Sequence, residues 1–193
     1  MKVIRVGVDL DGVIAQHSLG GFWFKLRKFK ERVLRRTHSP SYYFPETFVE
    51  RNAWIIIDWL RQPFKERNLL LSLAKDKKIK FYLITGRFKF LERLTIKWLK
   101  RNKLFNCFEK VLINTDNLEP TKFKAQKINQ LDLNFFIDDD LDTILALKKK
   151  TPAKLYWLMA VENKEINDSR VIPARSLVEA LKQIVLATEV FLK

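Results

Sequence analysis

Residues 3–14 constrain the fold of this chain more than any other stretch. An apolar, β-branched run ends in two aspartates one residue apart, Asp9 and Asp11, and Gly12 follows at once. Such a run predicts a buried strand of a parallel sheet. Residues i and i+2 of a strand point to the same side, so a bend just past Asp9 would let both carboxylates converge. Like charges that close predict a shared cation or proton; the alternative is two acids that merely end a strand at the surface.

The length and composition favour one globular domain, with or without a modest insertion. The chain has 193 residues, of which 47% are hydrophobic, enough for a substantial core. No apolar run approaches the roughly 20 residues of a membrane span. The aspartates at positions 9 and 11 interrupt the apolar N-terminal stretch that a signal peptide would need. We therefore expect a soluble, cytoplasmic protein without a membrane partner, either a monomer or a homodimer.

Cysteine and histidine are too scarce to build a metal site. Cys107 is the single cysteine, which excludes an intramolecular disulfide, and His17 and His38 are the only histidines. The formal net charge of +15 is spread along the chain and has three interpretations. It can reflect a nucleic-acid partner, an anionic substrate such as a phosphate ester, or a lysine-rich surface with no specific role.

Predicted strands alternate with predicted helices from residue 63 onward. This alternation predicts an α/β fold in which right-handed crossovers connect the strands of a parallel sheet. After the first strand, further strands are predicted at residues 79–85, 110–114, 134–140 and 155–159, and helices at residues 64–75, 90–102, 120–131, 141–149 and 176–191.

Residues 16–62 lack a strand partner in this pattern and are predicted to be an insertion. They contain predicted helices at residues 22–36 and 45–60, the second broken by Pro63, which otherwise starts the next helix. The basic residues of the first helix form either a solvated face or a surface toward an anionic substrate or nucleic acid. The aromatic loop of residues 37–45 either packs under a helix or stacks on a base.

Three predicted strands end in groups suited to phosphoryl transfer. Asp9 and Asp11 follow the first, Thr85 the second, and Asp138 and Asp139 a later one. The carboxyl ends of parallel strands share one sheet edge, so these groups can meet. Oxygen ligands alone favour Mg²⁺. A cation, a hydroxyl donor, a carboxylate nucleophile and a second acid together indicate phosphoryl transfer.

These motifs resemble those of the haloacid dehalogenase-like (HAD) phosphohydrolase superfamily over roughly residues 3–150. The first motif is Asp9-Leu10-Asp11-Gly12-Val13 and the second is Leu83-Ile84-Thr85-Gly86-Arg87. The fourth is Phe136-Ile137-Asp138-Asp139, and a lysine near the start of the helix at 121–131 would be the third. The resemblance implies a three-layer α/β/α Rossmann-like core, formed by residues 1–15 and 63–193, with residues 16–62 as a small α-helical cap.

The resemblance also implies a role for each acidic residue of the motifs. Asp9 would attack phosphorus and form an aspartyl-phosphate, and Asp11 would protonate the leaving alkoxide and then activate water. Mg²⁺ would be held by Asp9, the Asp11 backbone carbonyl and Asp138, with Asp139 binding directly or through water.

Thr85, Gly86 and a lysine would hold the phosphoryl group. Lys124 lies at the first turn of its predicted helix and is the preferred lysine; Lys122 is the rival, and Lys127 lies a turn too far along.

The form of the motifs is similar to the 5′(3′)-deoxyribonucleotidase branch of the superfamily. We therefore predict a Mg²⁺-dependent phosphatase with a small phosphorylated substrate, a nucleotide being one candidate. Two alternatives stay open: a phosphatase acting on nucleic-acid ends, which would suit the basic charge, and a HAD-like protein that binds without catalysis. Dehalogenation is disfavoured because it requires neither a metal nor the proton-shuttling Asp11.

Overall fold

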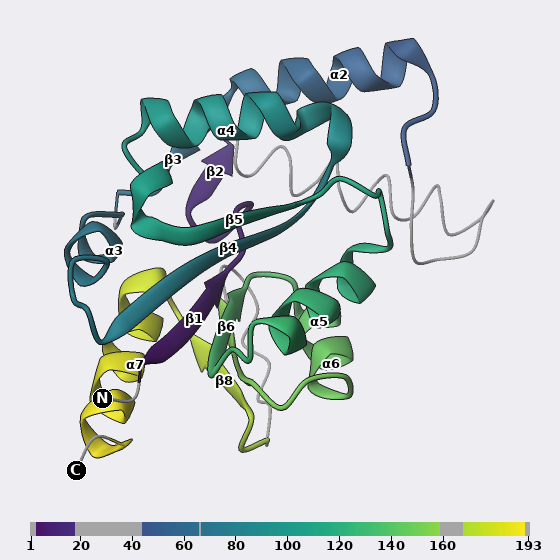
Figure 1. Ribbon diagram of the computed structural model, residues 1–193. Coiled ribbons are helices and arrows are strands. Elements are labelled where there is room, and N and C mark those ends of the chain that lie inside the picture. Colours follow the sequence, from purple (N-terminus) through teal and green to yellow (C-terminus); the bar gives the residue numbers. More distant parts are fainter. Residues whose placement is uncertain (1–2, 18–43, 66, 159–167, 192–193) are drawn as a thin grey trace.

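The centre of the molecule is a six-stranded parallel sheet, seen in a computed structural model that describes residues 3–17, 44–65, 67–158 and 168–191. The strand order is β5-β4-β1-β6-β7-β8, so the first strand lies in the middle (Figure 1). The strands are β1 (Ile4–Val8), β4 (Ile79–Phe88), β5 (Phe108–Asn114), β6 (Phe135–Asp138), β7 (Lys154–Leu158) and β8 (Val171–Ala174).

Apolar side chains on one face of β1, and the close approach of neighbouring side chains to Gly7 on the other, suit its central place. Val6 and Val8 are fully buried, and β1 pairs in parallel with β4 on one side and β6 on the other. Val8 is the partner of Leu83 in β4 and of Ile137 in β6. The carboxyl ends of the three strands therefore lie side by side, as the alternating pattern predicted.

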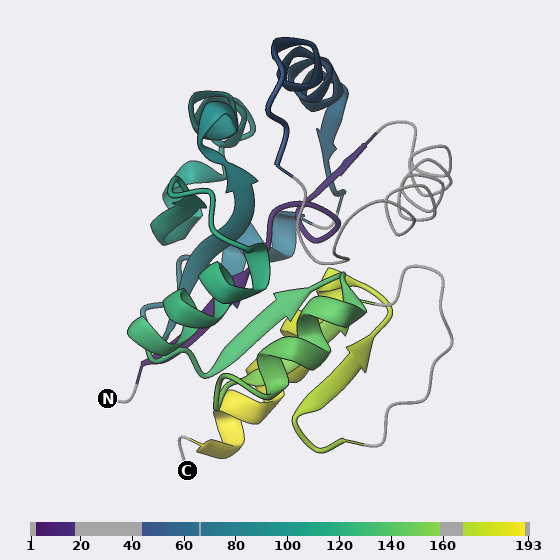
Figure 2. The same ribbon diagram turned by 90° about the vertical axis from the view of Figure 1, so that its right-hand side faces the viewer.

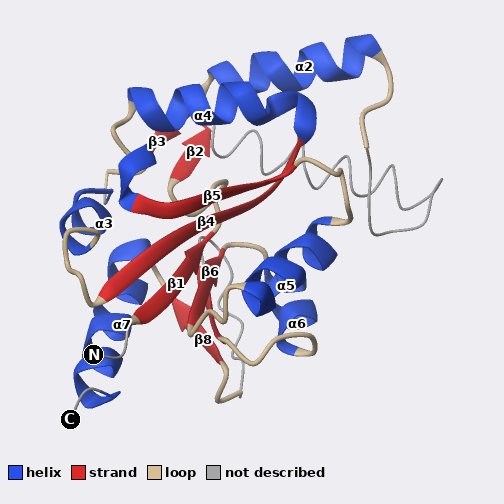
Figure 3. Cartoon of the chain, in the orientation of Figure 1, coloured by secondary structure: helices blue, strands red, loops and turns tan. Residues whose placement is uncertain are grey.

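Helices cover both faces of the sheet and complete three layers (Figures 1 and 3). One buried cluster joins β1 to side chains of α3, α4 and α7, and the other joins β4 and β6 to side chains of α5 and α6. Figure 2 shows α5 and α6 together on one side of the sheet. The helices are α3 (Arg67–Leu73), α4 (Glu92–Arg101), α5 (Pro120–Gln130), α6 (Leu141–Lys148) and α7 (Leu177–Phe191). The predicted α/β class is confirmed.

Two features of the sheet differ from the sequence prediction. Strand β4 continues to Phe88 instead of closing at Gly86, with an irregular register to β5 between Thr85 and Phe88. Strand β8 was not predicted. It has four residues, one of them Pro173, and lies at the sheet edge, where a missing backbone donor is tolerated. Such a short run carries little periodicity, so its pattern does not mark a strand.

The prediction that the insertion lacks strands was wrong. Ala15 begins β2 (Ala15–His17), which pairs antiparallel with β3 (Arg61–Pro63). Pro63 is the last residue of β3 and neither breaks nor starts a helix. Between them, α2 (Phe48–Trp59) agrees with the predicted second helix. The predicted helix at 22–36 and residues 37–43 of the aromatic loop lie outside the described residues. The division into core and cap stays a prediction.

Phe44, the described aromatic residue of that loop, packs against protein. Its ring meets Phe88 edge-on with centroids 5.2 Å apart, and Arg51 of α2 lies over it. Of the two interpretations of the aromatic loop, Phe44 therefore agrees with packing against protein. In the described ranges, no helix combines the length and apolar character required to cross a membrane.

Candidate active site

Three carboxylates gather at the carboxyl edge of the sheet. Asp9 follows β1, Asp138 ends β6, and Asp139 comes next. One carboxylate oxygen from each lies within 4.8 Å of the others. Asp9 and Asp138 are buried, with exposed fractions of 6% and 0%. The structure thus brings together three of the four predicted metal-ligating aspartates through their side chains.

Lys124 reaches into this cluster from α5. Its Nζ donates a hydrogen bond of 2.6 Å to Asp138 Oδ2 and lies 3.4 Å from Asp9 Oδ1. The rival Lys122 is exposed, and the Lys127 ammonium instead bonds Gln130. Of the three candidate lysines, the structure places Lys124 at the site.

Burial and like charge strain the carboxylates of this cluster. Burial raises the pKa of the Asp9 carboxyl well above its usual range; Lys124 opposes the shift and Asp138 adds to it. Burial by itself would lower the pKa of the Lys124 ammonium, but attraction by Asp138 and Asp9 outweighs it and raises that pKa. Within the described residues, Asp9 Oδ1 is buried and accepts no hydrogen bond.

Oxygen donors of this kind fit a hard divalent cation. The three acids supply only carboxylate oxygens, and within the described residues the buried Asp9 Oδ1 accepts no hydrogen bond, although the Lys124 ammonium lies 3.4 Å away. The residues present therefore suit Mg²⁺, with Asp9, Asp138 and Asp139 as the side chains that would hold it.

Gly12 makes the close approach of Asp139 possible. Gly12 has φ of +77°, and a Cβ added to it would lie 2.0 Å from Asp139 Oδ2. Only glycine both adopts this backbone conformation readily and leaves room for the carboxylate. The bend after Asp9 is closed by a hydrogen bond of 2.8 Å from the Gly12 backbone N–H to the Ala15 carbonyl.

Hydrogen bonds orient the acids that follow β6. The Asp140 backbone N–H donates to Asp138 Oδ1 at 3.1 Å, and the Trp157 indole N–H donates to the Asp139 carbonyl at 3.3 Å. Asp140 precedes α6 and accepts a hydrogen bond from Thr143, so it belongs to the start of that helix.

Thr85 and Gly86 lie on β4 beside this edge. Thr85 is buried and stands two residues beyond Leu83, the partner of Val8. A Cβ on Gly86 would lie 2.8 Å from the Pro120 Cβ, so the small residue lets the start of α5 approach. The same approach brings Lys124 toward the edge, which couples the second and third motifs.

Solved structures resemble the whole chain, whereas no protein-family model and no curated protein sequence matches it. A HAD-hydrolase from Bacillus subtilis, YfnB, solved with magnesium, has a TM-score of 0.65 at 15% identity and covers 95% of this chain and 99% of its own. A HAD phosphatase from Thermococcus onnurineus has a TM-score of 0.63 at 18% identity, with 95% and 98% covered. The L-2-haloacid dehalogenase RSc1362 has a TM-score of 0.62 at 8% identity, with 95% and 99% covered.

The chain has the haloacid dehalogenase-like (HAD) fold. Because these identities are low, the likeness establishes the fold and its three-layer Rossmann-like core, and it does not distinguish the chemistries that the fold supports. The similarity to the deoxyribonucleotidase branch is not confirmed by these neighbours.

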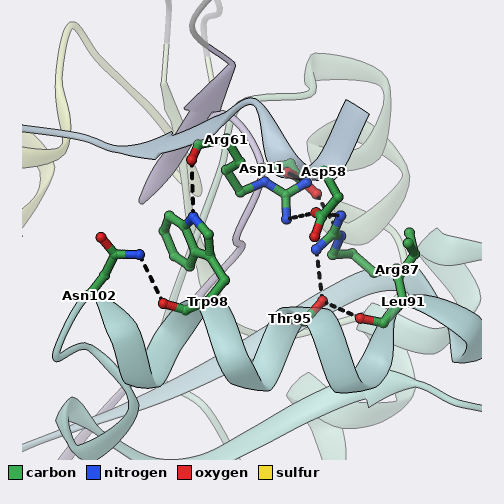
Figure 4. A network of polar contacts seen from close by, with 8 residues as sticks. All are labelled: Asp11, Asp58, Arg61, Arg87, Leu91, Thr95, Trp98 and Asn102. Atoms are coloured by element: carbon green, nitrogen blue, oxygen red, sulfur yellow. Dashed lines mark hydrogen bonds and ion pairs between the residues drawn. The ribbon is translucent and has the colours of Figure 1, made fainter. Parts of the chain in front are cut away.

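The side chain of Asp11 is not part of the three-carboxylate cluster of this HAD fold and instead contacts two arginines. Its Oδ1 lies 2.7 Å from Arg61 Nη2, and its Oδ2 lies 3.4 Å from Arg87 Nε (Figure 4). Asp58 of α2 forms ion pairs with both arginines. The side chain of Asp11 is 40% exposed, whereas those of the other three residues are nearly fully buried.

Sequence reasoning missed Asp58 and Arg61 and gave Arg87 no role. Arg87 directly follows the Thr85-Gly86 pair, and that position was a usable signal. Asp58 and Arg61 have i,i+3 spacing, but α2 ends between them, and nothing distinguishes Arg61 from the other basic residues of the chain.

Proposed function

We propose that the chain is a Mg²⁺-dependent phosphatase that hydrolyses a phosphate monoester through an aspartyl-phosphate intermediate. The observation that carries the proposal is the buried cluster of Asp9, Asp138, Asp139 and Lys124 at the carboxyl edge of the sheet. Such an arrangement suits phosphoryl transfer to a carboxylate, because the negative charge of the nucleophile and of the phosphoryl oxygens must be offset.

The first half-reaction uses Asp9 as nucleophile. An Asp9 carboxylate oxygen forms a bond to phosphorus while the bond from phosphorus to the ester oxygen breaks, and Asp11 gives its proton to the departing alkoxide. In the second half-reaction Asp11 takes a proton from water, the water oxygen bonds to phosphorus, and Asp9 is released. Bound Mg²⁺ would supply charge neutralisation of the phosphoryl oxygens.

Thr85 and Lys124 are proposed to hold the phosphoryl oxygens. Both are buried at the same edge as Asp9, and Lys124 is already within 3.4 Å of the nucleophile. The backbone N–H of Gly86 is a further donor at that edge.

Asp11 favours phosphoryl transfer over dehalogenation, although a dehalogenase is among the structural neighbours. Asp11 lies two residues from the proposed nucleophile and is a second carboxylate able to exchange a proton with the leaving group and water, and the oxygen cluster is suited to a hard cation. Displacement of halide needs neither. The intact set of acids also argues against a purely binding protein.

A nucleotide is the substrate class that we propose to test first, which would make the enzyme a 5′-nucleotidase. The formal charge of +15 favours an anionic substrate. A nucleic-acid end is the second candidate, favoured by a surface hollow on α4 lined by Arg93, Lys97, Lys100 and Arg101.

A phosphatase screen tests both candidates. Wild type should release phosphate in Mg²⁺ and lose activity in EDTA, and Asp9→Asn should be inactive. Substrates should include nucleotides, sugar phosphates and phosphorylated DNA ends. Steep loss of activity with moderate salt on DNA ends, but not on nucleotides, would select the nucleic-acid candidate. Equal inactivity of wild type and Asp9→Asn on every substrate would overturn the proposed function.

A further inference from the structure

Asp11 belongs to a closed ring of four charged side chains. Arg61 bridges the two aspartates: its Nη2 lies 2.7 Å from Asp11 Oδ1 and its Nη1 lies 2.7 Å from Asp58 Oδ1. Arg87 makes the second bridge, with Nε toward Asp11 and Nη2 toward Asp58 (Figure 4). Positive and negative groups alternate around the ring, and each residue touches two of the others.

The two arginines depend on Asp58 for their placement. Arg61 and Arg87 are buried, with side chains 2% and 5% exposed, and Asp58 is 4% exposed. Burial lowers the pKa of the Arg61 guanidinium, and Arg87 acts in the same direction, whereas Asp11 and Asp58 oppose the shift. Without Asp58, Asp11 would be the one carboxylate left in contact with these two buried like charges in the described part of the chain, and their repulsion would drive them apart.

Helix α4 holds the far side of each arginine. Arg87 Nη1 donates to Thr95 Oγ1 at 2.7 Å, and that hydroxyl donates to the Leu91 carbonyl at 2.9 Å. The Trp98 indole N–H donates to the Arg61 carbonyl at 3.2 Å. Helix α4 thus restrains the Arg87 guanidinium and the Arg61 backbone, and Asp58 is the partner that both guanidinium groups share besides Asp11.

We propose that Asp58 is a positioning residue, which acts through Arg61 and Arg87 to hold the Asp11 carboxylate in the orientation needed to protonate the leaving group. The proposal rests on the proposed function of Asp11. Since Asp58 comes from α2, it also means that a residue far from the four motifs, within the predicted cap, sets the geometry of a catalytic residue.

The distinguishing test compares two leaving groups. An alkyl phosphate needs its leaving oxygen protonated, whereas p-nitrophenyl phosphate releases a stable anion and does not. Asp58→Asn should therefore lower kcat/KM for the alkyl phosphate by about 10–100-fold, the cost of a misplaced general acid, and for p-nitrophenyl phosphate by less than about threefold. The constant kcat/KM is used because it reports the steps up to formation of the aspartyl-phosphate. Equal losses on both substrates would overturn the proposal.

A double-mutant cycle separates positioning from a structural role. If Asp58 acts through Asp11, Asp58→Asn should cause no further loss of kcat/KM for the alkyl phosphate once Asp11→Asn is present. A full additional loss in that background would contradict positioning. Asp132→Asn is the matched control, since it removes an ion-paired but exposed carboxylate at the opposite edge of the sheet and should leave both rates unchanged.

A charge-conserving variant and crystal structures of the variants test the positioning role further, the structures without relying on turnover. Loss of Asp58 leaves an uncompensated buried charge and can destabilise the fold. Asp58→Glu is therefore included as a variant that keeps the charge and moves it by one methylene. It should also lower kcat/KM more for the alkyl phosphate than for p-nitrophenyl phosphate, but by a smaller factor than Asp58→Asn. A crystal structure of either variant should show Asp11 displaced from Arg61 relative to the 2.7 Å contact. An unchanged contact would overturn the positioning role, whereas a wild type inactive on every substrate would overturn the proposed function instead.

Discussion

Two clusters of charged side chains meet at the carboxyl edge of the sheet, and they balance their charges differently. Around Asp9, three carboxylates gather with the ammonium of Lys124, the one cation that contacts them among the described residues. Around Asp11, two aspartates alternate with Arg61 and Arg87. The first set is therefore suited to a cation from solution, and in the second each carboxylate contacts both arginines.

This difference explains how two aspartates only two residues apart can take separate roles. The sequence pattern treats Asp9 and Asp11 alike, as acids at the end of one strand. In the structure, Asp9 is buried beside other carboxylates, whereas Asp11 is turned toward two arginines and is 40% exposed. The positions of the cationic partners, rather than of the aspartates themselves, separate the proposed nucleophile from the proposed acid.

The largest expected effect comes from Asp9→Asn, which should lower turnover by about 10³-fold or more because it removes the nucleophile. The same change should raise the melting temperature of the metal-free protein. Burial raises the pKa of Asp9 in the folded state, so the folded protein prefers the protonated carboxyl group. The free energy of unfolding therefore falls as pH rises from the unfolded-state pKa through the raised folded-state pKa. Asparagine removes this cost at neutral pH.

Thermal unfolding of both proteins in EDTA, at pH 5 and at pH 8, measures that cost. The advantage of Asp9→Asn should be larger at the higher pH. If Asp9→Asn melted below wild type at both pH values, repulsion among the carboxylates would not destabilise the cluster. The proposed difference in charge balance between this cluster and the ring around Asp11 would then be wrong.

Lys124→Met should destabilise the metal-free protein by about 3–5 kcal/mol, since it removes a buried ammonium that contacts two buried carboxylates. Mg²⁺ should restore part of the loss, because it supplies positive charge at the same place. Urea unfolding with and without Mg²⁺ measures both effects. Lys122→Met is the control, since Lys122 is exposed and was the rival lysine. Comparable losses in the two variants would contradict the placement of Lys124.

Gly12→Ala should weaken Mg²⁺ binding by about tenfold or more, since the added Cβ would collide with Asp139 and displace it. The positive φ of Gly12 adds a backbone cost of about 1–2 kcal/mol. Calorimetric titration with Mg²⁺ measures the loss of affinity, and a stability measurement in EDTA measures the backbone cost separately. Unchanged Mg²⁺ affinity in a destabilised protein would mean that Asp139 is not needed by the cation.

The sequence predicted those parts of this edge that follow from strand ends. Apolar runs ending in Asp9 and Asp138 mark buried parallel strands, and parallel strands place their carboxyl ends together whatever their distance along the chain. Lys124 was preferred among three lysines for its place in the first turn of the predicted helix, and its ammonium donates to Asp138 in the structure.

The ring could not be predicted in the same way. Arg61 follows α2 in the short strand β3, which is too brief to show a period, and its partner Asp11 lies 50 residues away in the sequence. In a chain with 37 lysines and arginines, charge alone does not single out two that are buried. Burial of a charge is decided by tertiary contacts, here with Asp58 and α4.

The smallest expected effect is at the exposed ion pair between Arg5 and Asp132, which tests whether burial gives the ring its weight. The pair is 3.2 Å apart, with side chains 42% and 85% exposed. Asp132→Asn should change the free energy of unfolding by less than about 0.5 kcal/mol, and salt should abolish even that, because water already screens the charges. Asparagine also tolerates the φ of +48° at this position. Urea unfolding at low and high salt, beside Asp58→Asn, measures the contrast. If Asp132→Asn lowered the free energy of unfolding as much as Asp58→Asn, burial would not distinguish the ring from an ordinary surface contact. The argument that Asp58 holds Arg61 and Arg87 in place would then be contradicted.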